Sequence, residues 1–123
     1  TAREIMDVAG EFVSTDETLA DAARKMRDLD IASLPICHQG TYLAGVMTDR
    51  DIVVRCIADG GDPYTAQAGD YVGGAAVTIG ADESIEQALI TMAAHRVRRL
   101  PVVEGDNLVG VLRQSDVTRV LVD

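Results

Sequence analysis

The chain has no tryptophan, and aromatic residues make up only 3% of its 123 residues. Aliphatic side chains and methionine must therefore fill the core. The sequence also lacks an apolar run of the ~20 residues that a transmembrane helix needs, and nothing at its start resembles a signal peptide. We therefore expect a cytoplasmic protein with no membrane partner.

Basic residues are also few. The chain has 11 Lys and Arg against 20 Asp and Glu, a formal net charge of −9, which argues against nucleic acid as a partner because a phosphate backbone requires a basic surface. One local exception is the run His95-Arg96-Val97-Arg98-Arg99. Arg96 alone fits a solvated helix end, where cations are favoured. Arg98 and Arg99 lead into an apolar strand and indicate an anion site.

Cysteine is limited to Cys37 and Cys56, which form no CxxC pair. We expect two reduced thiols in a cytosolic protein. Cys37-His38 offers two metal-ligand types, but no further ligands cluster nearby, so we expect burial of the cysteine and no metal. Redox sensing remains an alternative, because the sequence does not show whether a thiol is exposed with a low pKa.

What the chain does have is an internal repeat. Residues 13–19 match 79–85, residues 31–36 match 97–102, and residues 45–51 match 110–116. The offset is 66 at the prolines (101 − 35) and 65 at the glycines (110 − 45). A repeat predicts two similar units related by a pseudo-twofold axis, with paired clefts between them. Each half alone is too small to bury much surface, so we expect a shared core.

The patterns within each half predict the order strand, helix, strand, strand, helix. Apolar residues at helical spacing follow the capping patterns that begin at Thr18 and Ser84. We place the first repeat at residues 1–60, a linker at 61–65 and the second repeat at 66–123. The predicted fold class is α+β, with two pseudo-symmetric units packed through their sheets into one compact module.

This order, together with the segment Gly-h-h-Thr-x-x-Asp (h, hydrophobic) at residues 45–51 after a Leu-Pro-h strand, resembles the CBS domain. The whole chain resembles a stand-alone tandem CBS pair, or Bateman module. It looks most similar to small actinobacterial CBS proteins of the hypoxic-response type. The resemblance implies a regulatory, stress-response module that binds adenosine nucleotides or S-adenosylmethionine between its repeats, is not an enzyme, and forms homodimers. No obligatory cofactor is implied.

Residue by residue, the resemblance assigns a nucleotide site to the first repeat's motif. Thr48 would contact phosphate at a helix N-terminus, which is a general anion site, and Asp51 would bind a ribose diol. Gly45 would allow close approach, and Val46 and Met47 would face the purine. The segment before Pro101 is similar to the phosphate-binding segment His-Arg-Ile-His-Arg-Leu-Pro-Val of the gamma subunit of AMP-activated kinase, which adds Arg98 and Arg99. The alternative for Thr48 and Asp51 is a helix-capping box.

The second repeat departs from the family pattern. Arg113 replaces the threonine of the motif, and Ala32 and Ser33 replace the basic pair. Asp116 is retained, although it also fits simple helix capping. The sequence therefore predicts that a cleft with Ala32, Ser33, Arg113 and Asp116 is the weaker or altered site.

Besides redox sensing, the residues bear on three functions. The leading prediction is a regulatory protein that binds an adenosine nucleotide (AMP, ADP or ATP-like) and signals through oligomer or partner contacts. The second is a ligand-free CBS scaffold that acts only by protein–protein interaction. The third, catalysis, is not indicated, because His38 and His95 lie in non-equivalent places and have no partner readable from the sequence.

Overall fold

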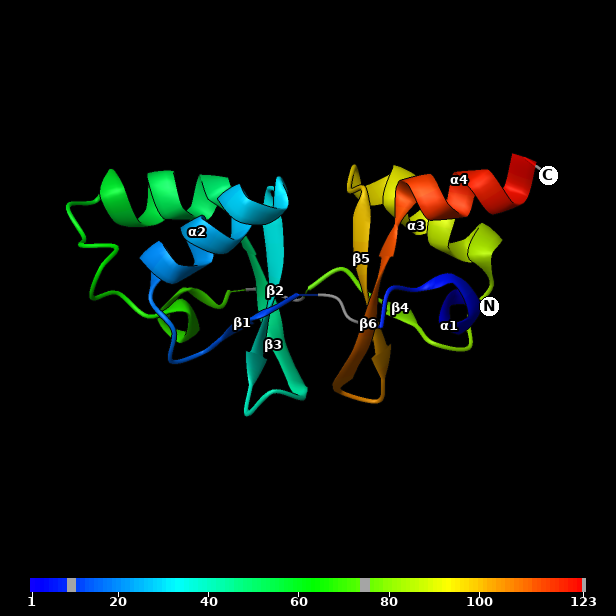
Figure 1. Cartoon of the computed structure of the whole chain (residues 1–123), viewed down its shortest axis with the longest axis horizontal. Helices are drawn as coiled ribbons and strands as arrows, with labels where there is room; N and C mark the ends of the chain where they lie inside the picture. The colour runs from blue at the N-terminus through cyan, green and yellow to red at the C-terminus, as the bar shows by residue number, and fades with distance from the viewer. Residues whose placement is uncertain (9–10, 74–75, 123) are drawn as a thin grey trace. The chain divides into compact units, whose positions relative to one another are not determined.

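The computed structural model describes residues 1–8, 11–73 and 76–122. The chain divides into two compact units: a central unit, Glu11–Ala76, and a terminal unit, which joins Thr1–Gly10 to Val77–Asp123. Each unit therefore contains most of one repeat plus the first residues of the other. We call these first residues the lead-ins: residues 66–73 in the central unit and residues 1–8 in the terminal unit. In each unit the longer helices lie on one side of the strands (Figure 1). This confirms the predicted α+β fold class with two similar units.

The central unit has three strands and three helical segments. Strand β2 pairs with β1 in parallel and with β3 antiparallel. In chain order the elements are β1 (Val13–Ser14), α2 (Leu19–Leu29), β2 (Ser33–His38), β3 (Tyr42–Thr48), η1 (Asp51–Ile57) and η2 (Ala68–Tyr71). The predicted closing helix is present, but η1 is a π-helix. In a π-helix the backbone hydrogen bonds join residues that are five apart. Here the Ala58 amide donates to the Val53 carbonyl at 2.9 Å.

The terminal unit repeats this arrangement. Strand β5 pairs with β4 in parallel and with β6 antiparallel. Its elements are α1 (Ala2–Ile5), β4 (Ile79–Gly80), α3 (Ile85–His95), β5 (Arg99–Glu104), β6 (Asn107–Arg113) and α4 (Gln114–Val122). No helix within the described parts of the chain is long and apolar enough to cross a bilayer.

The exchange of lead-in segments is held by equivalent backbone hydrogen bonds. In the terminal unit the Ala2 amide donates to the Glu83 carbonyl at 2.8 Å. In the central unit the Ala68 amide donates to the Glu17 carbonyl at the same 2.8 Å. The four residues correspond at an offset of 66 (68 − 2 and 83 − 17). Residues 2–5 and 68–71 therefore occupy equivalent positions in the two units.

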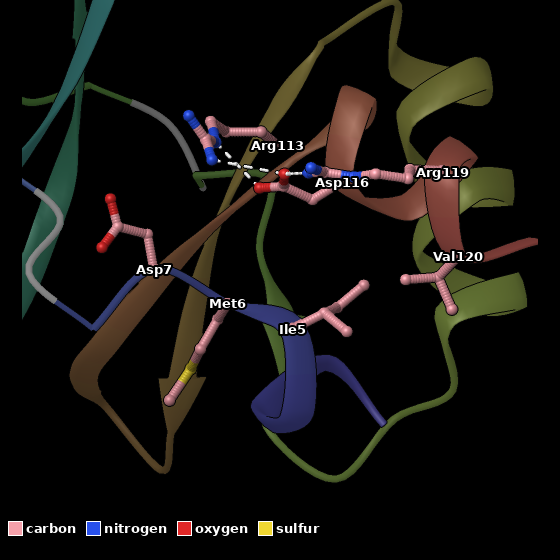
Figure 2. Close-up of a pocket in the computed structure, with 7 residues that line it drawn as sticks. All are labelled: Ile5, Met6, Asp7, Arg113, Asp116, Arg119 and Val120. Atoms are coloured by element: carbon pink, nitrogen blue, oxygen red, sulfur yellow. Dashed lines mark hydrogen bonds and ion pairs between the residues drawn. The ribbon is translucent and has the colours of Figure 1, made fainter.

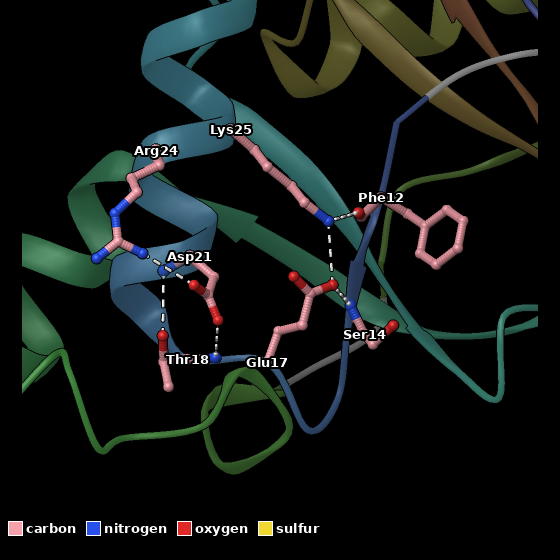
Figure 3. Close-up of polar contacts among 7 residues, drawn as sticks. All are labelled: Phe12, Ser14, Glu17, Thr18, Asp21, Arg24 and Lys25. Carbon is pink, nitrogen blue, oxygen red and sulfur yellow. Dashed lines mark hydrogen bonds and ion pairs between the residues drawn. The ribbon is translucent and has the colours of Figure 1, made fainter.

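Local sequence signals fix the helix starts. The Thr18 hydroxyl accepts from the Asp21 amide at 3.1 Å, and the Asp21 carboxylate accepts from the Thr18 amide at 3.1 Å. This capping box lowers the pKa of Asp21, mainly through the backbone hydrogen bond. Nearby, Lys25 donates to the Phe12 carbonyl and to Glu17, which ties α2 to the start of the unit (Figure 3).

Each unit has its own aliphatic core. The central core contains fully or almost fully buried side chains of β1, α2, β2, β3 and η1, among them Val13, Leu19, Met26, Leu34, Ile36, Met47, Ile52 and Cys56. The terminal core contains Ala2, Ile79, Ala81, Ala88, Met92, Leu100, Val102, Leu112 and Val117. Methionine and small aliphatic residues fill both cores, as the scarcity of aromatic residues required.

Candidate functional site

Thr48 and Asp51 form a helix-capping box at the end of β3. The Asp51 amide donates to the Thr48 hydroxyl at 3.1 Å, and the Thr48 amide donates to the Asp51 carboxylate at 2.9 Å. The next two amides are also bonded within the unit, Asp49 to the Ala32 carbonyl and Arg50 to the Asp49 carboxylate. The capping alternative is therefore present. Amides that would otherwise face an anion at this helix start already have partners.

Gly45 is explained by packing inside the central unit. A Cβ added at Gly45 would lie 3.2 Å from a methyl carbon of Val72. Gly110 is its counterpart, where an added Cβ would lie 2.7 Å from the sulfur of Met6. The motif glycines thus make room for the lead-in residues. Val46, half-buried, is paired with Pro35 across β2 and β3. The expectation that Met47 faces a purine is wrong, because its side chain is buried in the central core.

In the terminal unit the same motif positions hold an ion-pair cluster. Arg113 stands where the first repeat has Thr48, and its guanidinium donates twice to the Asp116 carboxylate, at 2.8 and 3.2 Å. Arg119, one turn further along α4, donates to the same carboxylate. Asp116 is only 7% exposed. A bidentate pair of this kind fixes the guanidinium geometry, and its hydrogen bonds raise the pKa of Arg113.

A pocket of about 430 Å³ opens beside this cluster (Figure 2). Charged groups and apolar side chains share its wall, which consists of Ile5, Met6, Asp7, Arg113, Asp116, Arg119 and Val120. All seven residues belong to the terminal unit. The first three come from the lead-in and the others from the end of β6 and from α4. The volume is in the range of small-molecule sites, whereas a wall with four charged residues of seven is more polar than such sites usually are.

Arg99 extends the charge cluster. It is the register partner of Arg113 in the β5–β6 pair, which places the two arginines next to each other on neighbouring strands. Partial burial and then the positive charge of Arg113 lower the pKa of Arg99, against the opposing effect of Asp7 and Asp116. Three arginines, Arg99, Arg113 and Arg119, therefore lie near the carboxylates of Asp7 and Asp116, which offset part of their positive charge.

The sequence-assigned residues fall into both units. Gly45, Val46, Thr48 and Asp51, with Ala32 and Ser33, belong to the central unit, whereas Arg98, Arg99, Arg113 and Asp116 belong to the terminal unit. Arg98 is exposed, and its carbonyl accepts from the Gln114 amide at 2.8 Å. Arg96, the C-cap of α3, is exposed with a left-handed backbone (φ 55°), in keeping with the expected helix end.

Five pocket residues were not among the sequence candidates: Ile5, Met6, Asp7, Arg119 and Val120. The first three enter through the exchanged lead-in, which a repeat alignment does not reveal. Arg119 could have been found from the sequence. It lies three residues after Asp116 on a predicted helix, and side chains of opposite charge at this spacing contact each other.

The cysteines are buried. Cys37 and Cys56 are both 0% exposed, and burial raises the pKa of Cys37 to about 11. A thiol in this state does not meet the requirements of a redox sensor. His38 contacts the Thr15 hydroxyl at 3.2 Å. Across the described residues, no group of three or more His, Cys, Asp or Glu side chains is placed to hold a metal ion.

Comparison with known proteins gives a consistent match. The family model described as CBS domain matches residues 2–57 and 68–123. The chain is 43% identical to hypoxic response protein 1 of Mycobacterium tuberculosis over 119 residues, covering 97% of this chain and 83% of that protein.

Solved structures give the same result. A crystal structure of hypoxic response protein I with two coordinated zinc ions matches with a TM-score of 0.86 and 44% identity, covering 97% of each chain. The structure of CBSX2 in complex with AMP matches with a TM-score of 0.82 over 99% of this chain and 96% of that one, at 22% identity. The second match shows the fold alone.

Proposed function

Because this chain belongs to the CBS-domain family as a tandem regulatory pair, we propose that it senses an adenosine nucleotide of the AMP, ADP or ATP type. Binding then changes its contacts with a second copy or with a protein partner. The proposal includes no catalytic step. The cytoplasm and a stress response are the proposed setting, the latter supported by the name of its hypoxic-response relative.

The pocket in the terminal unit is the observation that carries this proposal. Its volume of about 430 Å³ lies within the ~300–1,000 Å³ range of small-molecule sites. Arg113 and Arg119 line it, and each guanidinium retains N–H donors beyond those bonded to Asp116. These donors suit a phosphate, while Ile5, Met6 and Val120 offer an apolar surface for a purine. CBSX2, which has this fold, forms a complex with AMP.

The Gly45–Asp51 motif of the central unit is a second proposed position for the nucleotide. There the nucleotide would contact Gly45, Val46, Thr48 and Asp51, with phosphate contacts from Arg98 and Arg99. The sequence ranks this position above the one with Arg113 and Asp116. Two observations support the opposite ranking. The pocket lies beside Arg113 and Asp116, and the backbone amides of Thr48, Arg50 and Asp51 at the start of η1 already have hydrogen-bond acceptors.

Calorimetry with AMP on single variants tests the proposal. Loss of a charge-assisted contact typically costs ~1.5–3 kcal/mol, which corresponds to roughly ten- to hundredfold in affinity. We expect Arg113→Ala and Arg119→Ala, each of which removes a guanidinium from the pocket, to weaken AMP binding by at least about tenfold, and Asp51→Ala to weaken it much less. Arg24→Ala, in an exposed ion pair of the central unit, is the matched control. A large effect of Asp51→Ala with none of Arg113→Ala would restore the sequence ranking.

The ligand-free scaffold is the alternative function. A thermal-shift panel with AMP, ADP, ATP, NADH and S-adenosylmethionine separates the two, because a ligand that binds the native state raises its melting temperature. No shift at millimolar concentration of any of the five would reject nucleotide sensing and favour the scaffold.

A further inference from the structure

Two positions distinguish the two motif sites from each other. Relative to the motif aspartates, Arg55 in η1 corresponds to Val120 in α4, since both lie four residues after the aspartate. In the lead-ins, Tyr71 corresponds to Ile5 at the offset of 66. The pocket wall of the terminal unit contains Ile5 and Val120. The equivalent wall of the central unit would therefore contain Tyr71 and Arg55.

Arg55 lies across that wall. Its guanidinium donates to the Tyr71 carbonyl at 2.9 Å and lies 5.4 Å from the centroid of the Tyr71 ring. The same guanidinium is 3.7 Å from the Asp51 carboxylate. A Cβ added at Gly73 would lie 3.7 Å from one of its nitrogens. One side chain thus joins the motif aspartate to the lead-in on the other side of the site.

Both carboxylate oxygens of Asp51 have partners in this arrangement. One oxygen of Asp51 accepts from the Thr48 amide and the other faces Arg55. In the terminal unit the position of Arg55 is held by Val120, which is too short and too apolar to reach the lead-in carbonyl. Arg119 approaches Asp116 from one residue earlier in the helix instead, and the pocket remains open.

We propose that Arg55 closes the Thr48–Asp51 site of this chain, by spanning from Asp51 to Tyr71, so that the two motifs are one closed and one open site. The ligand excluded is an adenosine nucleotide, and in this respect the inference rests on the proposed function. Arg55 is here a specificity-determining residue that acts by occupying the site, not by contacting the ligand.

The first test converts the closed site to the open sequence. The double variant Arg55→Val, Tyr71→Ile copies Val120 and Ile5 into the central unit. Calorimetry with AMP should show binding to one site per chain in the original protein and to a second site in the variant. Binding that is weakened, or that stays at one site, would overturn the proposal. Weakening would instead make Arg55 a phosphate ligand.

The second test closes the open site. Val120→Arg introduces a guanidinium four residues after Asp116 and should weaken AMP binding by at least about tenfold, on the scale of a lost charge-assisted contact. Leu121→Arg adds the same charge at the neighbouring position, which does not line the pocket, and should leave affinity within about twofold. Equal effects of the two substitutions would mean that added charge, not closure, is responsible.

A third measurement does not depend on nucleotide binding. A crystal structure of the unliganded double variant should show a cavity bounded by Asp51, Val72 and the substituted residues. If the original protein binds no nucleotide but this cavity appears, the proposed function fails while the closure by Arg55 stands. If the cavity is absent because neighbouring side chains fill it, Arg55 is not the closing residue.

Discussion

Burial controls the chemistry of the Cys37 thiol. Its pKa is raised to about 11 by loss of solvent, and only the thiolate reacts with alkylating agents. At pH 8 roughly one thiol in a thousand is therefore ionised. We expect iodoacetamide to label Cys37 in the native protein far more slowly than in urea, with the rate rising as the pH approaches 11. Mass spectrometry locates the label, and rapid native labelling at pH 8 would contradict the buried state.

The glycine of each motif shows how a residue can belong to a binding pattern and still be explained by packing. In Gly110→Ala the new Cβ would lie 2.7 Å from the Met6 sulfur and 3.1 Å from the Asp7 carbonyl oxygen. Met6 can turn aside, but the Asp7 backbone is held by two hydrogen bonds to Val111. We expect a loss of ~1–3 kcal/mol in the free energy of unfolding, as for other overpacked sites.

Urea denaturation measures this loss. Gly45→Ala is the matched comparison, because its closest contact is 3.2 Å from a Val72 methyl, and it should cost less. Adding Met6→Ala to Gly110→Ala should recover only part of the stability, because the Asp7 carbonyl remains. Full recovery would show that the methionine alone limits the space.

At the scale of elements, the helix starts were predictable and the lead-in exchange was not. Thr18 and Ser84 each accept a hydrogen bond from the third helical amide, as their spacing indicated. The exchange could not be predicted because both halves offer the same backbone acceptors, the carbonyls of Glu17 and Glu83. An alignment shows that two segments are equivalent, but not which copy each one contacts. The pocket was missed for the same reason.

The capping box at Thr48 gives a prediction about the element it begins. Thr48→Ala removes the hydroxyl that accepts from the Asp51 amide, and loss of such a cap costs ~0.5–2 kcal/mol. Thr48→Ser should retain most of the stability, because serine caps equally well. Chemical denaturation of both variants in the absence of nucleotide measures the change in the free energy of unfolding. If Thr48→Ala is as stable as the original protein, the Thr48 hydroxyl does not stabilise the helix start and is free to bind a ligand.

At the scale of the whole molecule, the sequence predicts a homodimer through the closing helices and the packing of the two units through their sheets. Among the apolar positions it named, Ile52, Cys56 and Val117 belong to the cores, whereas Val53 and Val120 are 57% and 43% exposed. Ile57 on η1 is also exposed, at 52%. An apolar helix face of this kind requires a partner more than an isolated exposed residue does.

We therefore expect a dimer of the 13.1 kDa chain by light scattering at micromolar concentration. The double variant Val53→Asp, Ile57→Asp should be monomeric, because a twofold interface would bring the new charges on both copies into a desolvated contact. Tyr42→Asp, which replaces another half-exposed apolar residue (49%) in the β2–β3 hairpin, should remain dimeric. Circular dichroism of all three proteins verifies the fold. A single species near 13 kDa for the original chain would reject the dimer, and signalling would then have to proceed through a different protein partner.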